Sequence, residues 1–426
     1  MFSRALPRAV PRAGRFAQCE ARPQALSKLP QRTWAPLQQQ SGRRQRSSFV
    51  AGMKENYNRN PILFPFAMGC ILLLTGFAVT YLPWYYQNVI IAPYHNFPEP
   101  VAKKLRRAIY YSKGKNIDLR EANKYFRQAL QIANEMGIDP FSPEILGVKY
   151  AISQLFEQAG HYPLACDVLE IMRVDCQRWM DEYSDRHWTD GDRSRVLKVI
   201  VQLNVKLGEL YTSKYMNQPE DAEKRLVDAV EIALKERARR EKDGVKEGEG
   251  EFLTDEELGG ALESLGHHYE RNDKHYLATP LFLQALSYCP QKSCHSVVLM
   301  NNISTCLAQQ TPPPPSTSPP TKSSFPTTKP PSRAELVDQA RQWANKAIEH
   351  AATIAPPERT EECDVGCAVA THNLGEFFEM EGRWKEARLK YEEADSVAKV
   401  VGFEEGRERA KEGIRRLEGK EREGKK

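Results

Sequence analysis

The sequence predicts an all-α protein: a solenoid of about six TPR-like helix hairpins with one transmembrane helix near its N-terminus. Two observations lead to this fold class. One is a pattern of small and large residues that recurs at fixed spacing through most of the chain. The other is an uncharged apolar segment that is long enough to cross a bilayer. A hydrophobic content of 41% over 426 residues is enough for such an array to bury a core.

Residues 1–48 are predicted to be a mitochondrial presequence, disordered on its own. The first 59 residues hold twelve Lys or Arg and two acids, so they carry a charge of +10. Because the whole chain carries +5, the remainder carries −5. A basic, Ser-rich head with few acids is typical of a presequence, whereas a nucleic-acid binder carries its positive charge on the folded domain. A disordered basic tail without a targeting role is the alternative.

Residues 62–82 contain no charge and predict a transmembrane helix. At roughly 1.5 Å per residue this helix extends about 31 Å, which matches the hydrocarbon core of a bilayer. Lys54 and Arg59 precede the segment, and the next charged residue after it is Glu99. The positive-inside rule then predicts a single pass through the mitochondrial inner membrane, with the N-terminus in the matrix and the body in the intermembrane space. A buried core helix is the alternative.

A repeat follows the membrane segment. Counted from a leading apolar residue, small residues recur at +1, +13 and +20 and large ones at +4 and +17, with glycine favoured at +8. Three segments follow these offsets: Ile152, Ser153, Phe156, Gly160, Ala165, Leu169 and Met172; Leu265, Gly266, Tyr269, Asp273, Ala278, Phe282 and Ala285; Leu374, Gly375, Phe378, Gly382, Ala387, Tyr391 and Ala394. Small residues stand where two antiparallel helices approach closely, and large ones fill the space beside them. This is the tetratricopeptide (TPR) signature.

Three further units fit the pattern with insertions or with a degenerate first helix. They contain Ala122, Phe126 and Ala129; Leu207, Gly208, Tyr211, Ala222, Leu226 and Ala229; and Ile303, Ser304, Leu307, Ala340, Ala344 and Ala347. Helix starts are marked by Asp118 with Glu121, Ser142 with Pro143, Thr254 with Glu257, and Ser332 with Glu335. The repeats are therefore expected over residues 97–310 and 333–403.

The remaining segments are insertions and an end cap. Residues 311–332 contain nine prolines and predict a Pro-rich disordered insert on the surface, rather than a ligand for another domain. Residues 236–252 are charged and contain several glycines, so they are expected to form a solvent-facing loop. Residues 404–426 predict a capping helix and tail, with Ile414 and Leu417 on its apolar side. A basic interaction tail is the alternative for this last segment.

The sequence predicts no catalytic residues, no cofactor and no metal site. It contains no phosphate loop, no HExxH zinc helix and no GxSxG nucleophile motif. His267, His268 and His275 lie close together in the chain, but adjacent histidines on a helix point in different directions, so structural roles are expected. We therefore expect a protein that is not an enzyme.

Four cysteines in the C-terminal half have spacings that bear on the redox compartment. Cys289 and Cys294 flank a turn and could bridge. Cys363 and Cys367 stand one helical turn apart, a spacing that resembles that of oxidatively imported intermembrane-space proteins, although those carry twin motifs. Buried or free thiols are the favoured expectation, with the oxidation state left open.

The first helix of each pair is expected to line a concave groove, with positions −5, −2, +2 and +5 from the leading apolar residue facing inward. The predicted protein-binding residues are Tyr150, Gln154, Glu157, Gln202, Glu209, Glu263, His267, Glu270, Asn301, Thr305, His372, Glu376 and Glu379. These positions carry no Lys or Arg, which disfavours a clamp for a C-terminal carboxylate and favours basic or unfolded polar segments as ligands. Alternatively, the glutamates serve only to keep the array soluble.

Three stretches suggest a family: LPWYY at 82–86, YHNFPEPVAKKLRRAIYYS at 94–112 and DPFSPEILGVKYAISQLFEQAG at 139–160. With the presequence, the single span and the interrupted repeats, the chain resembles the fungal TPR adaptor subunit of the mitochondrial i-AAA protease complex. The resemblance covers roughly residues 60–310 and 360–420. It implies association with the i-AAA protease and its other adaptor subunit, and delivery of unfolded or misfolded client proteins for quality-control degradation. The charge distribution, with a basic head on an acidic body, predicts no nucleic-acid partner.

A second hypothesis belongs to a different class. The chain could be a TPR assembly factor or receptor for respiratory-complex subunits or imported proteins, since an acidic groove would also suit basic targeting sequences. A presequence receptor must face the cytosol, and a matrix-directed head argues against that orientation. An assembly factor with the predicted topology remains the competing hypothesis.

Overall fold

The computed structural model describes residues 49–113, 117–311 and 331–423, and the regular elements in these ranges are all helices. The presequence predicted at residues 1–48 and most of the Pro-rich insert lie outside the described residues. The chain divides into two compact units, Met1–Pro83 and Trp84–Lys426, which are considered separately below.

The N-terminal region contains α1 (Phe49–Arg59) and α2 (Leu63–Tyr85). The apolar helical stretch that begins with α2 continues to Val89 and is long and apolar enough to cross a membrane; its most apolar window is 0% buried. The hydroxyl of Thr75 donates to the carbonyl oxygen of Ile71 at 2.8 Å, so this polar group is satisfied within the helix. The span predicted at 62–82 therefore corresponds to α2, which has the length and composition of a transmembrane helix.

Six helix hairpins form most of the second unit, after the short turns η1 (Tyr86–Ile91) and η2 (Ala92–Tyr94). The pairs are α3 (Glu99–Ser112) with α4 (Leu119–Glu135), α5 (Pro143–Gln158) with α6 (Tyr162–Tyr183), α7 (Asp192–Thr212) with α8 (Pro219–Asp243), α9 (Asp255–Arg271) with α10 (His275–Tyr288), α11 (His295–Gln309) with α12 (Arg333–Thr353), and α13 (Glu361–Met380) with α14 (Trp384–Val401). The turn η3 (Ser184–Arg186) follows α6. The predicted TPR-like solenoid is confirmed.

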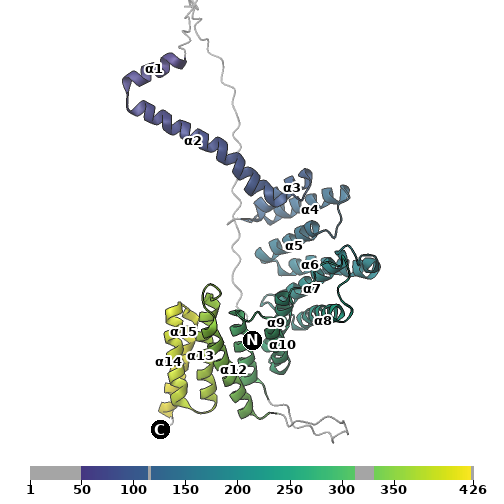
Figure 1. The fold of residues 1–426 in the computed structure, drawn as a ribbon, viewed down its shortest axis with the longest axis vertical. Helices are drawn as coiled ribbons and strands as arrows, with labels where there is room; N and C mark the ends of the chain where they lie inside the picture. Colours follow the sequence, from purple (N-terminus) through teal and green to yellow (C-terminus); the bar gives the residue numbers. More distant parts are fainter. Residues whose placement is uncertain (1–48, 114–116, 312–330, 424–426) are drawn as a thin grey trace, which may run out of the picture. The chain divides into compact units, whose positions relative to one another are not determined.

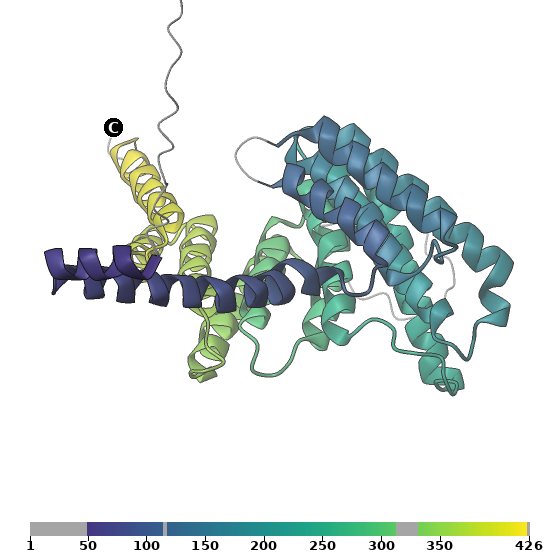
Figure 2. The ribbon, with the colours of Figure 1, turned by 90° about the horizontal axis from the view of Figure 1, so that it is seen from above.

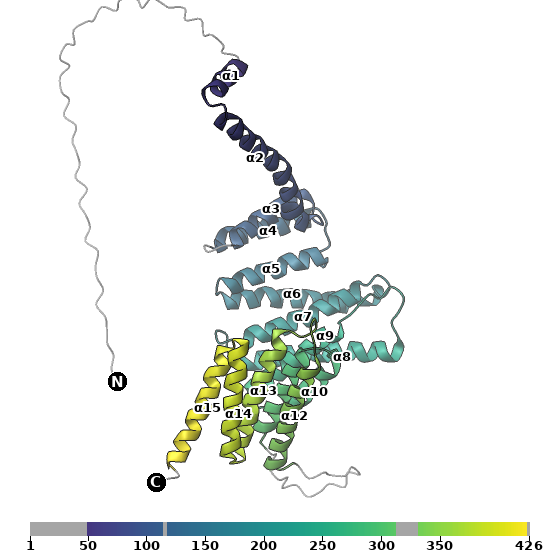
Figure 3. The same ribbon diagram turned by 60° about the vertical axis from the view of Figure 1, so that its left-hand side comes forward.

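Successive hairpins pack on one another in chain order. Figures 1 and 3 show α3 to α10 stacked one after another and α12 to α15 side by side. The last helix, α15 (Glu404–Glu423), packs on both α13 and α14 and closes the array. Figure 2 shows this helix in yellow at the C-terminal end of the chain. First helices also contact one another, since α7 packs on α9 and α11 on α13. The first helices therefore lie along the inner side of the stack.

The small residues of the repeat stand where its pattern predicts close helix contacts. A Cβ on Gly266 would lie 2.8 Å from the ring of Phe282, and one on Gly208 would lie 2.4 Å from the side chain of Leu226. Ser153, which replaces glycine in its unit, donates a hydrogen bond to the carbonyl oxygen of Ala165 at 3.1 Å. These contacts fix the register of three hairpins and confirm the repeat, including the unit interrupted before α8.

The predicted helix starts are also confirmed. The Thr254 hydroxyl accepts from the amide of Glu257 at 3.2 Å, and the Glu257 carboxylate accepts from the amide of Thr254 at 2.9 Å. Ser332 and Glu335 form the same reciprocal pair at the start of α12. The carboxylate of Asp118 accepts from the first turn of α4, and the hydroxyl of Ser142 accepts from that of α5. These bonds satisfy amides that have no partner within their own helix.

The solvent-facing loop expected at residues 236–252 is confirmed only in part: residues 244–251 form a loop that is exposed except at Glu249, whereas residues 236–243 belong to α8. Helix α8 continues to Asp243, and the segment after it folds back against the start of α7. Glu236 and Glu249 are only 4% and 1% exposed. A Cβ on Gly248 would lie 2.1 Å from the carbonyl oxygen of Thr189, so the two backbone segments are in direct contact.

Arginines explain this burial. Arg193, Arg239 and Arg240 surround Glu236 and Glu249, with Nη2 of Arg193 and Nε of Arg240 each 3.1 Å from Glu236 oxygens. Burial raises the pKa of Glu236, but hydrogen bonds from the three arginines outweigh it and hold the pKa at about 2. The hydrophilic composition of this segment predicts that its side chains are exposed. In the structure the two glutamates are buried, because the arginines compensate their charges inside the fold.

The expectation that the cysteines are buried or free thiols is wrong for one pair. Cys294 forms a disulfide with Cys363, which ties the start of α11 to α13. The considered bridge between Cys289 and Cys294 is not formed, and Cys289 and Cys367 are free. The bonded cysteines are 69 residues apart in the sequence, so their proximity arises only when α11 and α13 pack on each other.

Candidate functional site

Four hollows follow one another along the first helices and form the candidate binding site. They lie between α3 and α5, α5 and α7, α7 and α9, and α9 and α11, with volumes of about 950, 490, 340 and 390 Å³. Tyr85 and Val89, at the end of the apolar stretch, also line the first hollow. Consecutive hollows share lining residues: Gly147 joins the first to the second, Tyr150 and Gln202 the second to the third, and Gly260 the third to the fourth. Because consecutive hollows share lining residues, they follow one another as a groove along the first helices.

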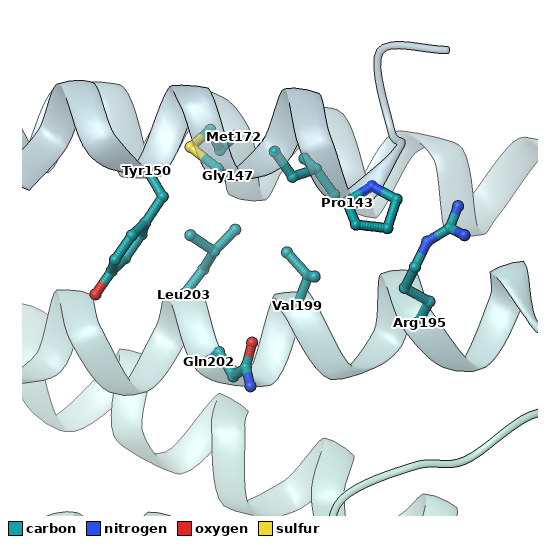
Figure 4. A pocket seen from close by; sticks show the side chains of 9 residues that line it. Pro143, Gly147, Tyr150, Met172, Arg195, Val199, Gln202 and Leu203 are labelled. Carbon is teal, nitrogen blue, oxygen red and sulfur yellow. The ribbon is translucent and has the colours of Figure 1, made fainter. Parts of the chain in front are cut away.

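The α5/α7 hollow is mainly apolar. Figure 4 shows Val199 and Leu203 of α7 pointing toward α5, with Tyr150 at one end of the hollow and Arg195 at the other. The floor is completed by Leu146, which is 5% exposed. A hollow of this kind can take an apolar side chain, with polar groups of Tyr150 and Arg195 at its ends.

The α7/α9 hollow contains a cation that the position rule missed. Nζ of Lys206 lies 3.1 Å from Oε1 of Glu157 and 4.0 Å from Oε2 of Glu209. Burial raises the pKa of Glu209, and the Glu157 charge acts in the same direction, while Lys206 opposes both. Lys206 immediately precedes Leu207, outside the counted positions, but its long stem carries the ammonium group into the groove. The expectation of a groove lining without Lys or Arg is therefore wrong.

An alternating network of acids and histidines crosses the α9/α11 hollow. This acid–histidine network consists of Glu270, His267, Glu263, His295 and Glu362. Oε2 of Glu263 lies 2.8 Å from Nε2 of His295, and Oε1 lies 3.4 Å from Nε2 of His267. The outer nitrogens face acids as well, with Nδ1 of His267 3.0 Å from Glu270 and Nδ1 of His295 2.9 Å from Glu362. The acid–histidine network thus links α9, α11 and α13.

The protonation states of the groups in the acid–histidine network follow from its geometry. Hydrogen bonds to the carboxylates raise the pKa of both His267 and His295 to about 9. Burial raises the pKa of Glu263, but its bonds with the two imidazoles outweigh that effect and hold the pKa at about 2. Each imidazole has a carboxylate at both ring nitrogens, and only the doubly protonated cation can donate to both. Both histidines are therefore cationic at neutral pH.

Two predicted groove residues are occupied by contacts between helices. Asn301 is 4% exposed, and its Nδ2 donates to the carbonyl oxygen of Gly366 at 2.9 Å. The hydroxyl of Thr305 accepts from Nδ2 of Asn373 at 3.3 Å. These side chains join α11 to α13, so the structure assigns them a packing role.

The predicted residues of α13 face the end cap. Oε2 of Glu379 accepts from the Tyr391 hydroxyl at 2.8 Å, and Arg416 and Lys420 of α15 lie 3.2 and 3.0 Å from its carboxylate. Glu376 lies 3.9 Å from Arg416. Nε2 of His372 lies 3.5 Å from Glu376. Helix α15 therefore supplies the basic partner of these acids.

The structure thus divides the predicted groove residues into three groups. Tyr150, Gln202, Glu209 and Glu263 line the hollows; Glu157, His267 and Glu270 join the lining through ion pairs, with Gln154 exposed on the same helix as Tyr150; Asn301, Thr305, His372, Glu376 and Glu379 contact neighbouring helices. Binding by any of these residues stays a prediction.

Several lining residues were missed: Leu146, Val199, Leu203, Arg195, His295 and Glu362. All six stand four or more residues before the leading apolar residue of their helix. Extending the counted positions by seven residues toward the start of each first helix reaches Arg195 and Glu362, whereas the other four stand outside the counted positions.

Metal ligation was considered at two histidine groups. His267, His268 and His275 do not share a site, because Nε2 of His268 faces Asn272 at 3.2 Å while His267 faces its own acids. Within the described ranges, His187, Asp190 and Asp192 have ligand atoms close enough to hold an ion. The Asp192 carboxylate is already paired with Arg195 at 2.8 Å, which leaves this cluster as an ordinary charged surface turn.

Comparison with known proteins agrees with the helical repeats. No protein-family model matches the chain. The chain is 24% identical over 313 residues to a TPR repeat-containing protein of Schizosaccharomyces pombe, covering 73% of this chain and 76% of that protein.

Two solved structures show a more distant similarity. BtubC from P. vanneervenii is 13% identical with a TM-score of 0.43, covering 67% of this chain and 91% of that one. The quorum sensor NprR from B. thuringiensis is 13% identical with a TM-score of 0.38, covering 83% and 86%. The TPR-like repeat fold described above is that of a protein-binding scaffold.

Proposed function

We propose that the protein is a non-enzymatic inner-membrane adaptor that binds unfolded or misfolded proteins and delivers them to the i-AAA protease for quality-control degradation. The observation that carries this proposal is the groove along the first helices. An unfolded client is an extended segment with mixed side chains, and it needs a long surface that offers both apolar and charged positions. The four connected hollows provide such a surface.

In this proposal α2 spans the mitochondrial inner membrane once, with the N-terminus in the matrix and the solenoid in the intermembrane space. The basic head and the charge asymmetry around α2 support this orientation. The disulfide between Cys294 and Cys363 also supports it, because disulfides persist in oxidising compartments rather than in reducing ones.

The proposed partners are the i-AAA protease, its other adaptor subunit and unfolded clients. The resemblance to the fungal adaptor, carried by the stretches at 82–86, 94–112 and 139–160, supports the first two. The groove supports the third. No cofactor and no nucleic acid enter the proposed mechanism, which consists of binding and positioning alone.

Affinity capture of the tagged chain from gently solubilised mitochondria tests the proposal. We expect the i-AAA protease in near-stoichiometric amount, together with unfolded clients. Respiratory-complex subunits without the protease would instead support the assembly-factor hypothesis, for which the acidic α9/α11 hollow would bind basic segments of imported proteins.

A charge reversal tests the role of the groove within the same experiment. Glu209→Lys adds positive charge to the groove lining at a side chain that is 54% exposed, so the fold should tolerate it. We expect fewer co-purifying clients and an unchanged amount of protease. Glu182→Lys is the matched control, because Glu182 is exposed on the second helix α6, away from the groove lining. Equal client loss in both variants would contradict client binding in the groove.

A further inference from the structure

Two glycines inside first helices are not explained by the packing of the chain. Gly147 lies within α5 and Gly260 within α9; both are exposed, and a Cβ at either would meet nothing within 4 Å. A glycine in the interior of a helix destabilises the helix, because glycine loses more conformational freedom on folding than other residues. The other glycines inside the first helices, all of which are described, have a neighbouring atom within 4 Å of such a Cβ: Gly208, Gly259, Gly266, Gly366 and Gly375.

Both unexplained glycines line the groove where hollows meet. Gly147 belongs to the α3/α5 and α5/α7 hollows, and Gly260 belongs to the α7/α9 and α9/α11 hollows. A larger side chain at either position would enter the space that joins two hollows. Their absent side chains therefore keep the groove open and leave room for a bound chain to approach the helix backbone.

The two positions differ in chemistry. Arg195 is the one charged residue of the α5/α7 hollow, which is otherwise lined mainly by apolar side chains. The α9/α11 hollow is lined by four carboxylates and one imidazole: Asp255, Glu256, Glu263, Glu362 and His295. Arg237 pairs with Asp255 at 2.6 Å from outside the hollow. His267 pairs with Glu263 as well, so three cations (His295, Arg237 and His267) face four carboxylates and the α9/α11 hollow stays net negative at neutral pH.

We infer that the groove binds an unfolded polypeptide segment with an apolar side chain in the α5/α7 hollow at Gly147 and a Lys or Arg side chain in the α9/α11 hollow at Gly260. The inference rests on the proposed function and names the chemistry of the client. Charge complementarity selects the basic residue, and the apolar floor of Leu146, Val199 and Leu203 selects the other. Segments that combine the two chemistries are preferred over purely polar or acidic ones.

The test uses the full chain in lipid nanodiscs and fluorescence anisotropy with three peptides of equal length. The first carries spaced leucine and arginine residues, the second has serine for leucine, and the third has glutamate for arginine. We expect the second and third peptides to bind the wild-type chain at least tenfold more weakly than the first.

Glycine substitutions then assign the hollows. Gly147→Leu should weaken the first peptide about tenfold and abolish the preference for leucine over serine, while the preference for arginine over glutamate remains. Gly260→Leu should have the converse effect. Gly419→Leu is the matched control, because Gly419 is an exposed glycine inside α15 with nothing within 4 Å of its Cβ, and it does not line the groove.

Thermal unfolding separates a binding defect from misfolding. Open space surrounds both glycines, so each leucine variant should unfold at the wild-type temperature or above it. Wild-type affinity in both groove variants, or equal wild-type binding of all three peptides, would overturn the inference. Either result would leave the proposed function standing, because that function is judged by capture of the protease.

Discussion

Gly375 and Gly413 lie against opposite edges of the same aromatic ring. A Cβ on Gly375 of α13 would lie 2.7 Å from Cδ1 of Tyr391, and one on Gly413 of α15 would lie 2.8 Å from its Cε2. Tyr391 is fully buried on α14. The capping helix thus repeats, on the outer edge of the ring, the close contact that the repeat pattern specifies on the inner edge.

Gly413→Ala should therefore destabilise the end of the solenoid. A methyl group there would force the Tyr391 ring or α15 to move, at a cost of about 1–3 kcal/mol for overpacking. The urea concentration at half-unfolding, followed by circular dichroism, measures the effect. Gly419→Ala in the same helix meets open space and should leave that midpoint unchanged or raise it. Equal midpoints for the two variants would show that the contact with Tyr391 is unimportant.

Loss of the disulfide should destabilise the C-terminal hairpins. Cys363→Ser opens a link between residues 69 apart, and a lost disulfide of this kind costs about 2–4 kcal/mol. Reductant should lower the unfolding midpoint of the wild-type chain and leave that of Cys363→Ser unchanged. Cys367→Ser, one turn along the same helix, changes a free thiol and should keep the response to reductant. Insensitivity of the wild-type chain to reductant would contradict a stabilising role for the bond.

The acid–histidine network predicts that the stability of the fold depends on pH. The folded pKa of His267 and His295 is raised from 6.5 to about 9, so their contribution to stability is fully present below about 6.5 and lost as pH rises to about 9. Glu263, with a pKa lowered from 4.5 to about 2, contributes above 4.5 and loses that contribution as pH falls to about 2. Between pH 6.5 and 9 the stability advantage of the wild-type chain over His295→Gln should shrink. An advantage that is constant over this range, measured by urea unfolding, would refute the coupling.

Glu249→Gln should be among the most damaging single substitutions. It removes a buried charge from Arg239 and Arg240, and leaving one partner of a buried pair unbalanced costs about 3–5 kcal/mol. Glu247→Gln, two residues away, changes an exposed side chain and should have little effect. Urea unfolding of the two variants provides the comparison, and similar midpoints would show that the buried cluster contributes little.

The sequence predicted local features of the fold well, because they depend on short spacings. Gly266 contacts Phe282 and Thr254 caps α9 through interactions that the repeat and the capping pattern already contain. Pairings between distant segments could not be predicted. Cys294 meets Cys363 only once α13 has packed on α11. Glu249 is buried because arginines from two helices reach it, although its surroundings in the sequence are rich in charged residues and glycine.

For the groove, too, only part of the lining could be predicted from the sequence. Counting fixed positions found Tyr150, Glu209 and Glu263 but excluded Lys206, whose charged end reaches the groove from a flanking position. The rule also treated Glu379 as open, whereas α15 brings Arg416 and Lys420 onto it. Periodicity gives the direction of a side chain from its helix, but the length of the side chain and the neighbouring helix decide what it meets.

The disulfide between Cys294 and Cys363 also closes a covalent ring, which contains the part of the chain between them. That ring contains α12 and the Pro-rich stretch at residues 312–330. A protease that cut the backbone anywhere inside the ring would open it without releasing a fragment, since the two pieces would stay joined through sulfur. Such a nicked molecule would run as one species without reductant and as two pieces with it.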